Sequence, residues 1–214
     1  MGDLVRQQLR TGHTWVASIA SVAALAFSGY NFSQLQETPQ TDLALPVTLK
    51  LDRDESGTSV MLQPTVSTRY DTSDVEMITD VRLELKPEAG TGTAPDFYWR
   101  ENVKWSVIPS EPNQGGGSVW WEFASDPVPF NVTQTTPQQQ ILQFKTHNWN
   151  LTPGRYTGTL TLLRASTRDP IVRPFCLALR SEDIKTILNE PGSYFEFRRD
   201  VPGKHAGGCY HRYG

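Results

Sequence analysis

The sequence predicts a mainly β protein: an N-terminal transmembrane helix, then an antiparallel β-sandwich of immunoglobulin or fibronectin III type with one short helix near the C-terminus. Three observations predict it. One uncharged run lies near the N-terminus, apolar and polar residues alternate through most of the remainder, and turn residues recur at intervals of roughly 10–15 residues. A barrel is the alternative arrangement of the same strands.

The uncharged run covers Thr14–Phe32. A helix of that length extends about 28 Å, close to the thickness of a bilayer core. Arg6 and Arg10 precede the run, whereas the first basic residue after it is Lys50. Because basic residues stay on the cytoplasmic side, we expect a signal anchor in the inner membrane, with a cytoplasmic N-terminus and an extracytoplasmic β domain.

Two other interpretations of this run stay open. A cleaved signal peptide would use Ala24-Leu25-Ala26 as its processing site. An ordinary buried or interfacial helix would fit the serines that make the run only moderately apolar. The aromatic residues at its ends, Trp15, Tyr30 and Phe32, favour the anchor, since such rings suit the headgroup level of a bilayer.

Small residues recur every four positions in the run, at Ala20, Ala24 and Ser28. A stripe of this kind lets two helices approach closely in lipid. The sequence therefore indicates helix–helix contact and a homo-oligomer formed through the span.

The predicted organisation has five parts. They are a cytoplasmic tail over 1–13, the transmembrane helix over 14–32, a linker over 33–45, the sandwich over 46–199, and a flexible C-terminal tail over 200–214.

Within the sandwich, Thr79–Lys86 is the clearest strand, because apolar and charged residues alternate without a break. Arg155–Arg164 and Pro170–Arg180 form the clearest hairpin. A short helix follows, with Ser181 as its cap and acidic residues in its first turn, where the helix dipole favours them.

The composition excludes some classes of function. The 214-residue chain has a net charge of −3 and no basic block, which argues against nucleic-acid binding. It contains no HExxH, GxSxG, P-loop or GxGxxG motif. We therefore expect neither an enzyme nor a cofactor.

The two cysteines, Cys176 and Cys209, can pair in an extracytoplasmic compartment. The alternative is a buried thiol in a strand and an idle one in the tail. His205, Cys209 and His211 are also spaced closely enough to hold Zn²⁺ or copper, although no fourth ligand is evident.

Two further groups of residues have candidate roles. Carboxylates flank two predicted turns and are candidates for Ca²⁺ ligands or paired acids; they are Asp52, Asp54, Glu55, Asp71 and Asp74. Trp120 and Trp121 are adjacent in a predicted strand, so their side chains leave on opposite faces. We expect one in the core and the other exposed, where it would bind a sugar ring or a partner.

Several short stretches carry a resemblance to a known group. Gly12–Trp15, Ser18–Ala20 and Phe27–Tyr30 resemble the N-terminus of uncharacterised bacterial proteins with one short span and an immunoglobulin-like exterior domain. Pro153–Thr161 is similar to a late strand of such sandwiches. The resemblance implies a topology and no chemistry.

Together these features favour a membrane-tethered extracytoplasmic binding or scaffold module for a protein partner in the envelope. The first alternative is carbohydrate or cell-wall recognition through an exposed Trp. The second is a hydrolase that uses the carboxylates.

Overall fold

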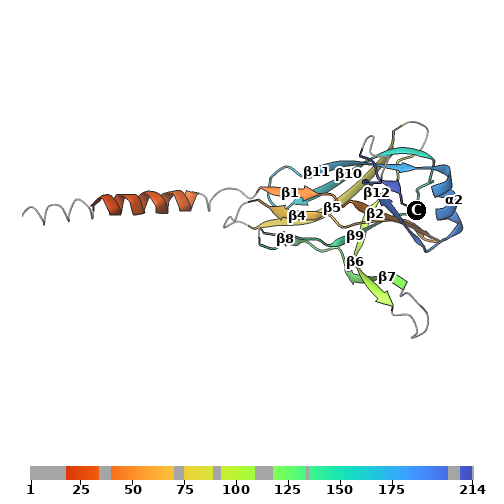
Figure 1. The fold of residues 1–214 in the computed structure, drawn as a ribbon, viewed down its shortest axis with the longest axis horizontal. Helices are drawn as coiled ribbons and strands as arrows, with labels where there is room; N and C mark the ends of the chain where they lie inside the picture. The colour runs from red at the N-terminus through yellow and green to blue at the C-terminus, as the bar shows by residue number, and fades with distance from the viewer. Residues whose placement is uncertain are drawn as a thin grey trace, which may run out of the picture.

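A computed structural model describes residues 18–33, 40–69, 75–88, 93–108, 118–133, 135–201 and 208–213. Within these residues the chain is mainly β, with antiparallel sheets and two short helices (Figure 1). The mainly β prediction is therefore confirmed.

The largest sheet has seven strands in the order β13-β12-β2-β3-β9-β6-β7. Its strands are β2 (Thr48–Asp54), β3 (Gly57–Leu62), β6 (Tyr98–Ile108), β7 (Ser118–Ser125), β9 (Ile141–Thr146), β12 (Tyr194–Arg198) and β13 (His211–Arg212). Every neighbouring pair in it is antiparallel.

The second sheet has four strands in the order β11-β10-β5-β8. They are β5 (Glu76–Pro87), β8 (Phe130–Val132), β10 (Gly154–Arg164) and β11 (Ile171–Leu179). A small sheet pairs β1 (Thr41–Ala44) with β4 (Thr65–Thr68). The predicted hairpin is confirmed as β10–β11, with Gly154 opposite Leu179 and Leu162 opposite Ile171.

The core lies between the two large sheets. Leu51, Phe144 and Phe197 from the seven-stranded sheet are fully buried, as are Leu160 and Leu177 from the four-stranded one. Each such side chain contributes about 1.5–3 kcal/mol of burial free energy. The alternation of apolar and polar residues places these side chains on the inner faces, so the sheets form a sandwich.

Tyr156 fixes the corner where the chain enters β10. Its hydroxyl donates to the Thr152 carbonyl oxygen at 2.8 Å and accepts from the Thr152 backbone N–H at 3.2 Å. The ring is buried and packs edge-on against Trp149, with ring centroids 5.5 Å apart. This corner joins the loop to the core on the side of the four-stranded sheet.

Helix α2 (Ser181–Asn189) follows β11, as the sequence predicts. Its cap differs from the prediction: Ser181 is already helical, and the capping position belongs to Arg180. The Asp183 carboxylate accepts the Arg180 backbone N–H at 2.9 Å and its guanidinium N–H at 2.9 Å. A buried acid in the first turn therefore replaces the expected serine hydroxyl.

The described part of the C-terminal tail, residues 208–213, is fixed on the sandwich, in contrast to the flexible tail that the sequence predicts. Cys209 forms a disulfide with Cys176 in β11. The backbone N–H of Tyr210 donates to the Cys176 carbonyl oxygen at 2.8 Å, and the next residues pair with β12 as β13. The tail thus lies along the edge strands of both large sheets on one side of the sandwich.

Tyr210 anchors this arrangement. Its side chain is buried, its hydroxyl donates to the Pro46 carbonyl oxygen, and its ring packs edge-on against Phe175. Burial raises the pKa of its phenol to about 12. The phenol therefore stays protonated across the physiological range and keeps its hydrogen bond.

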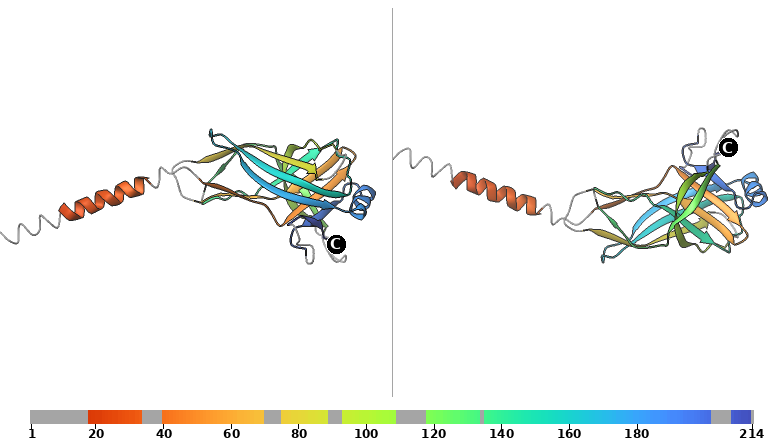
Figure 2. Two further views of the ribbon diagram at one scale, coloured as in Figure 1. Left: turned by 90° about the horizontal axis from the view of Figure 1, so that it is seen from above. Right: turned by 90° about the horizontal axis from the view of Figure 1, so that it is seen from below.

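The N-terminal helix covers residues 18–33, and every one of these residues is exposed. In all views it lies at one end of the molecule, away from the sheets (Figure 2). None of the described helices has both the length and the apolar character needed to cross a bilayer. The predicted transmembrane helix Thr14–Phe32 is thus unsupported; its first four residues lie outside the described part.

The body also begins earlier than predicted. β1 falls within the stretch expected to be a linker, over 33–45, and its Leu43 is buried in the core. A four-residue strand with one buried side chain leaves too weak a pattern to separate from a polar connector.

Removing the disulfide is expected to destabilise the fold. A cross-link between residues 33 apart stabilises by about 2–4 kcal/mol, mainly by restricting the unfolded chain. Cys176→Ser/Cys209→Ser should therefore lower the urea midpoint of unfolding under oxidising conditions. Under reducing conditions the variant and the unaltered chain should unfold alike. An unchanged midpoint under oxidising conditions would contradict this prediction.

Candidate functional site

Half of the β6–β7 hairpin leaves the seven-stranded sheet. β9 pairs with β6 only from Tyr98 to Val103, whereas β7 continues to pair with β6 as far as Ile108. We call residues 104–108 together with β7 the arm. Seen from below, the hairpin lies in front of the seven-stranded sheet (Figure 2). A two-stranded hairpin alone is marginally stable, so the arm needs contacts with the body.

Trp105 supplies such a contact. Its ring lies 5.3 Å from that of Tyr194 in β12, and the Lys50 Nζ of β2 sits 3.5 Å from the centre of the indole. The same ammonium is 4.7 Å from the Tyr194 ring. Partial burial lowers the pKa of Lys50, against the opposing effect of Glu196. Cation–π contacts therefore clamp the arm across the outer face of the sheet.

The arm also carries exposed aromatic residues. Trp120 is 49% exposed and Phe123 is 54% exposed. The predicted pair Trp120 and Trp121 lies in β7, with ring centroids 6.1 Å apart and planes only 4° apart. Trp121 is half-buried opposite Trp105 and lies outside the core cluster, so neither ring takes the core position that we expected for one of them.

β7 is also an edge strand. Within the described part of the chain it pairs with β6 alone, so its other edge has no ladder partner. An unpaired edge with large apolar side chains is a surface that natural proteins usually blunt or cover. The arm therefore combines backbone hydrogen-bonding capacity with aromatic surface.

The predicted metal ligands lie only partly within the described residues, and one of them is engaged in a disulfide. His205 lies outside the described residues, Cys209 is bonded to Cys176, and His211 is in β13. Among the described residues, no group of three or more His, Cys, Asp or Glu side chains could hold a metal ion. The predicted stripe of Ala20, Ala24 and Ser28 is helical and exposed, and its role in helix–helix contact stays a prediction.

The carboxylates Asp52 and Asp54 do come together, around a buried lysine. Lys145 of β9 is only 1% exposed, and its ammonium donates to the Asp54 carboxylate at 2.9 Å and to the Ser56 hydroxyl. Gly57 permits the tight turn, since its φ is +140° and a side chain there would strike the Thr146 carbonyl oxygen. Asp71 and Asp74 lie outside the described residues, and Glu55 is exposed.

The two carboxylates have opposite pKa shifts. Burial, with the charge of Asp54, raises the pKa of Asp52 to about 6 in spite of Lys145. Partial burial alone would raise the pKa of Asp54, but hydrogen bonds from Lys145 and Ser56 lower it to about 2. One oxygen of Asp52, Oδ1, is buried without a hydrogen-bond partner in the described structure.

A split pair of carboxylates is also what acid–base catalysis uses, so a hydrolase needs to be weighed. Asp52 is only 3% exposed, and the cavity of about 670 Å³ beside β5 is lined by other residues. A substrate therefore has no access to it through that cavity. The buried Lys145 is paired with Asp54 and lies beside Asp52, and we assign the cluster a structural role.

Sequence reasoning missed both the arm and the buried Lys145. Lys145 alternates with the core residues Leu142 and Phe144 in β9, as an outward-facing polar residue does. Yet all residues of β9 after Ile141 are buried, on both faces of the strand. The local sequence pattern does not reveal that Lys145 is buried, because elements distant in the sequence cover it.

No protein-family model, curated protein or solved structure matches this chain.

Asp52→Asn should change how stability depends on pH. Since the pKa of Asp52 is raised in the folded protein, ionisation of this carboxyl destabilises the fold. This destabilisation is absent below about pH 4 and grows as the pH rises to about 6. The variant should gain stability relative to the unaltered chain over this window, by up to about 3 kcal/mol. Urea unfolding at intervals from pH 4 to pH 8 measures the difference.

Asp54→Asn is the matched control, and it should change the stability of the fold in the opposite direction. The lowered pKa of Asp54 stabilises the fold above about pH 4, and this contribution is lost as pH falls towards 2. The Asp54→Asn variant should therefore be less stable than the unaltered chain at pH 7. Parallel pH profiles for both variants would contradict the assignment of the two shifts.

Trp105→Ala should release the arm. The aromatic and cation–π contacts are together worth roughly 1–3 kcal/mol, so amides at 104–108 and 118–122 should exchange with deuterium about 10–100-fold faster. Trp120→Ala, which removes an exposed ring from the same hairpin, is the control and should leave these rates unchanged. Equal acceleration in both variants would show that Trp105 is not the clamp.

Proposed function

We propose that this chain is an extracytoplasmic binding module with an immunoglobulin-like sandwich, which contacts a protein partner through the arm. The observation that carries the proposal is the unpaired edge of β7, with Trp120 and Phe123 exposed along it. Large aromatic residues dominate the binding energy of protein interfaces.

The strand order supports the immunoglobulin-like assignment. In chain order, β2, β3, β5, β6, β9, β10 and β11 take the places of strands A to G, because β2-β3-β9-β6 form one sheet and β5-β10-β11 the other. Tyr156 matches the tyrosine corner of such domains, near the start of strand F. β8 departs from the pattern, since it pairs with β5 but follows β6 and β7 in the chain.

The disulfide supports an extracytoplasmic location, because such bonds persist in oxidising compartments. Anchoring in the inner membrane, with a cytoplasmic N-terminus, stays a prediction. Its support is the uncharged, fully exposed surface of the helix over residues 18–33. A full-length chain that remained in the soluble fraction of lysed cells would remove it.

Carbohydrate recognition is the second candidate, and the parallel rings of Trp120 and Trp121 favour it. Two nearly parallel indoles offer flat apolar surface to a sugar ring. We rank it second because Trp121 is half-buried, which leaves Trp120 as the main exposed ring of the pair.

Site-specific photo-crosslinking in the native host separates these functions. A photoreactive phenylalanine analogue at Trp120 or Phe123 should capture the same protein, whereas one at Val172 should not. Val172 is a matched control, because it is also 49% exposed but lies in β11.

Equal crosslinking from all three positions would contradict docking through the arm. Failure to crosslink, together with an oligosaccharide-dependent change in tryptophan fluorescence that Trp120→Ala abolishes, would support carbohydrate recognition instead.

A further inference from the structure

The two sides of the sandwich differ in how they are closed. On one side the tail pairs with β11 at Tyr210 and with β12 through β13. On the other side, β5 pairs with β8 only at Glu76–Ile78 and then makes one isolated bridge, Glu84 to Asp96. Between these points, Thr79–Leu83 has no ladder partner on that side among the described residues.

The free edge presents main-chain groups of alternate residues. The Glu88 backbone N–H donates to the Arg155 carbonyl oxygen of β10 at 2.9 Å. In an antiparallel strand the N–H and C=O groups of successive residues point to opposite sides. Like Glu88, the residues at 86, 84 and 82 therefore direct these groups towards β10. The residues between them face the open side, where the N–H and C=O of Val81 and the N–H of Leu83 lie.

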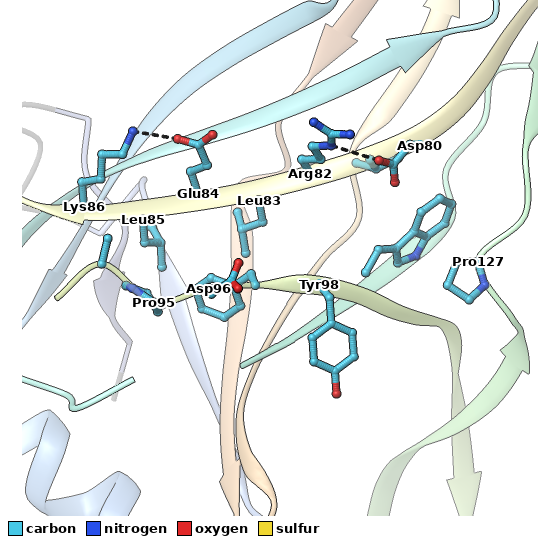
Figure 3. Close-up of a pocket in the computed structure, with 14 residues that line it drawn as sticks. Asp80, Arg82, Leu83, Glu84, Leu85, Lys86, Pro95, Asp96, Tyr98 and Pro127 are labelled. Atoms are coloured by element: carbon cyan, nitrogen blue, oxygen red, sulfur yellow. Dashed lines mark hydrogen bonds and ion pairs between the residues drawn. The ribbon is translucent and has the colours of Figure 1, made fainter. Parts of the chain in front are cut away.

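A cavity of about 670 Å³ lies beside this edge (Figure 3). Leu83 and Leu85 point from β5 towards the segment that carries Asp96 and Tyr98 (Figure 3). Phe97, Trp99 and Pro127 complete a largely apolar wall. The open stretch of five residues is about 17 Å long at a rise of about 3.4 Å per residue.

Charges line the outer rim of the cavity. Arg82 is paired with Asp80 at 3.0 Å, and Lys86 with Glu84 at 2.8 Å. Asp96 is exposed and has no ion-pair partner within the described residues. The rim therefore carries one uncompensated negative charge, which favours a basic group on the occupant.

We propose that this groove binds an extended peptide segment of a partner protein, which adds as a strand to the free edge of β5. Its alternate apolar side chains face the partly buried Phe97 and Trp99, and a Lys or Arg of the segment pairs with Asp96. Main-chain hydrogen bonds give affinity in this mode, and the pockets for alternate side chains give specificity. On the opposite side of the sandwich, the C-terminal tail of the same chain pairs with the edges of β11 and β12 in this way.

This groove is separate from the arm, since none of the residues that line it belongs to the arm, and a peptide can occupy it whether or not the arm contacts a partner.

The test uses the full-length chain and one acetylated, amidated eight-residue peptide that alternates Val with Thr and Lys. Hydrogen exchange of the Val81 and Leu83 amides should slow when the peptide is added. N-methylation of the peptide residues along one edge should weaken binding at least about tenfold, since the methyl groups remove the donors to β5. N-methylation along the other edge should leave the affinity unchanged.

Variants of the protein test the charge. Asp96→Lys should weaken binding of this peptide several-fold. Glu190→Lys, which makes the same reversal of charge in an exposed residue at the end of α2, should leave binding unchanged. The proposal is overturned if the peptide does not bind, if both N-methylated forms bind equally, or if the protected amides lie elsewhere. The Val81 amide could instead be protected from exchange without peptide and lose this protection when the protein is diluted. That result would assign the groove to a second copy of this chain.

Discussion

A β-sheet ends at two strands whose outer N–H and C=O groups lack a ladder partner, and a sandwich has to satisfy, cover or expose each such row. This constraint organises the molecule more than any single side-chain contact. On one side of the sandwich, the C-terminal segment pairs with β11 and with β12. On the other side, β5 and β7 keep stretches that have no ladder partner among the described residues. The candidate sites are these open stretches, because there the main chain retains unused hydrogen-bonding capacity.

The two open edges differ in what surrounds them. β7 belongs to a hairpin that crosses the outer face of a sheet and contacts that face through Trp105. β5 is a central element of the core, and its stretch Thr79–Leu83, which has no ladder partner on that side among the described residues, lies beside a cavity with apolar walls. The first edge presents aromatic side chains to the surroundings, whereas the second presents a groove. One small domain therefore has two open edges with different kinds of surface.

The elements that depend on local pattern are predictable from the sequence. The apolar and charged residues of β5 alternate from Asp80 to Lys86, and β10 alternates over most of its length. The structure has β5, β10 and β11 within a few residues of the predicted bounds. The arm was not predictable, because period-two alternation continues through Trp105 and Trp121 whether or not a third strand lies alongside. Lys145 and the tail depend on partners distant in the sequence, so their burial leaves no local signal. The expected membrane span extends into residues outside the described part, and the described helix alone does not support it.

The fastening of the last residues has a consequence for biogenesis. Tyr210 and β13 fill positions beside β11 and β12, and the disulfide locks them there. A growing polypeptide therefore cannot complete this fold while residue 212 is still inside the ribosome or a translocation channel. Until then the outer edges of β11 and β12 lack the tail as a partner. During that time a chaperone or thiol oxidase can act on the nascent protein.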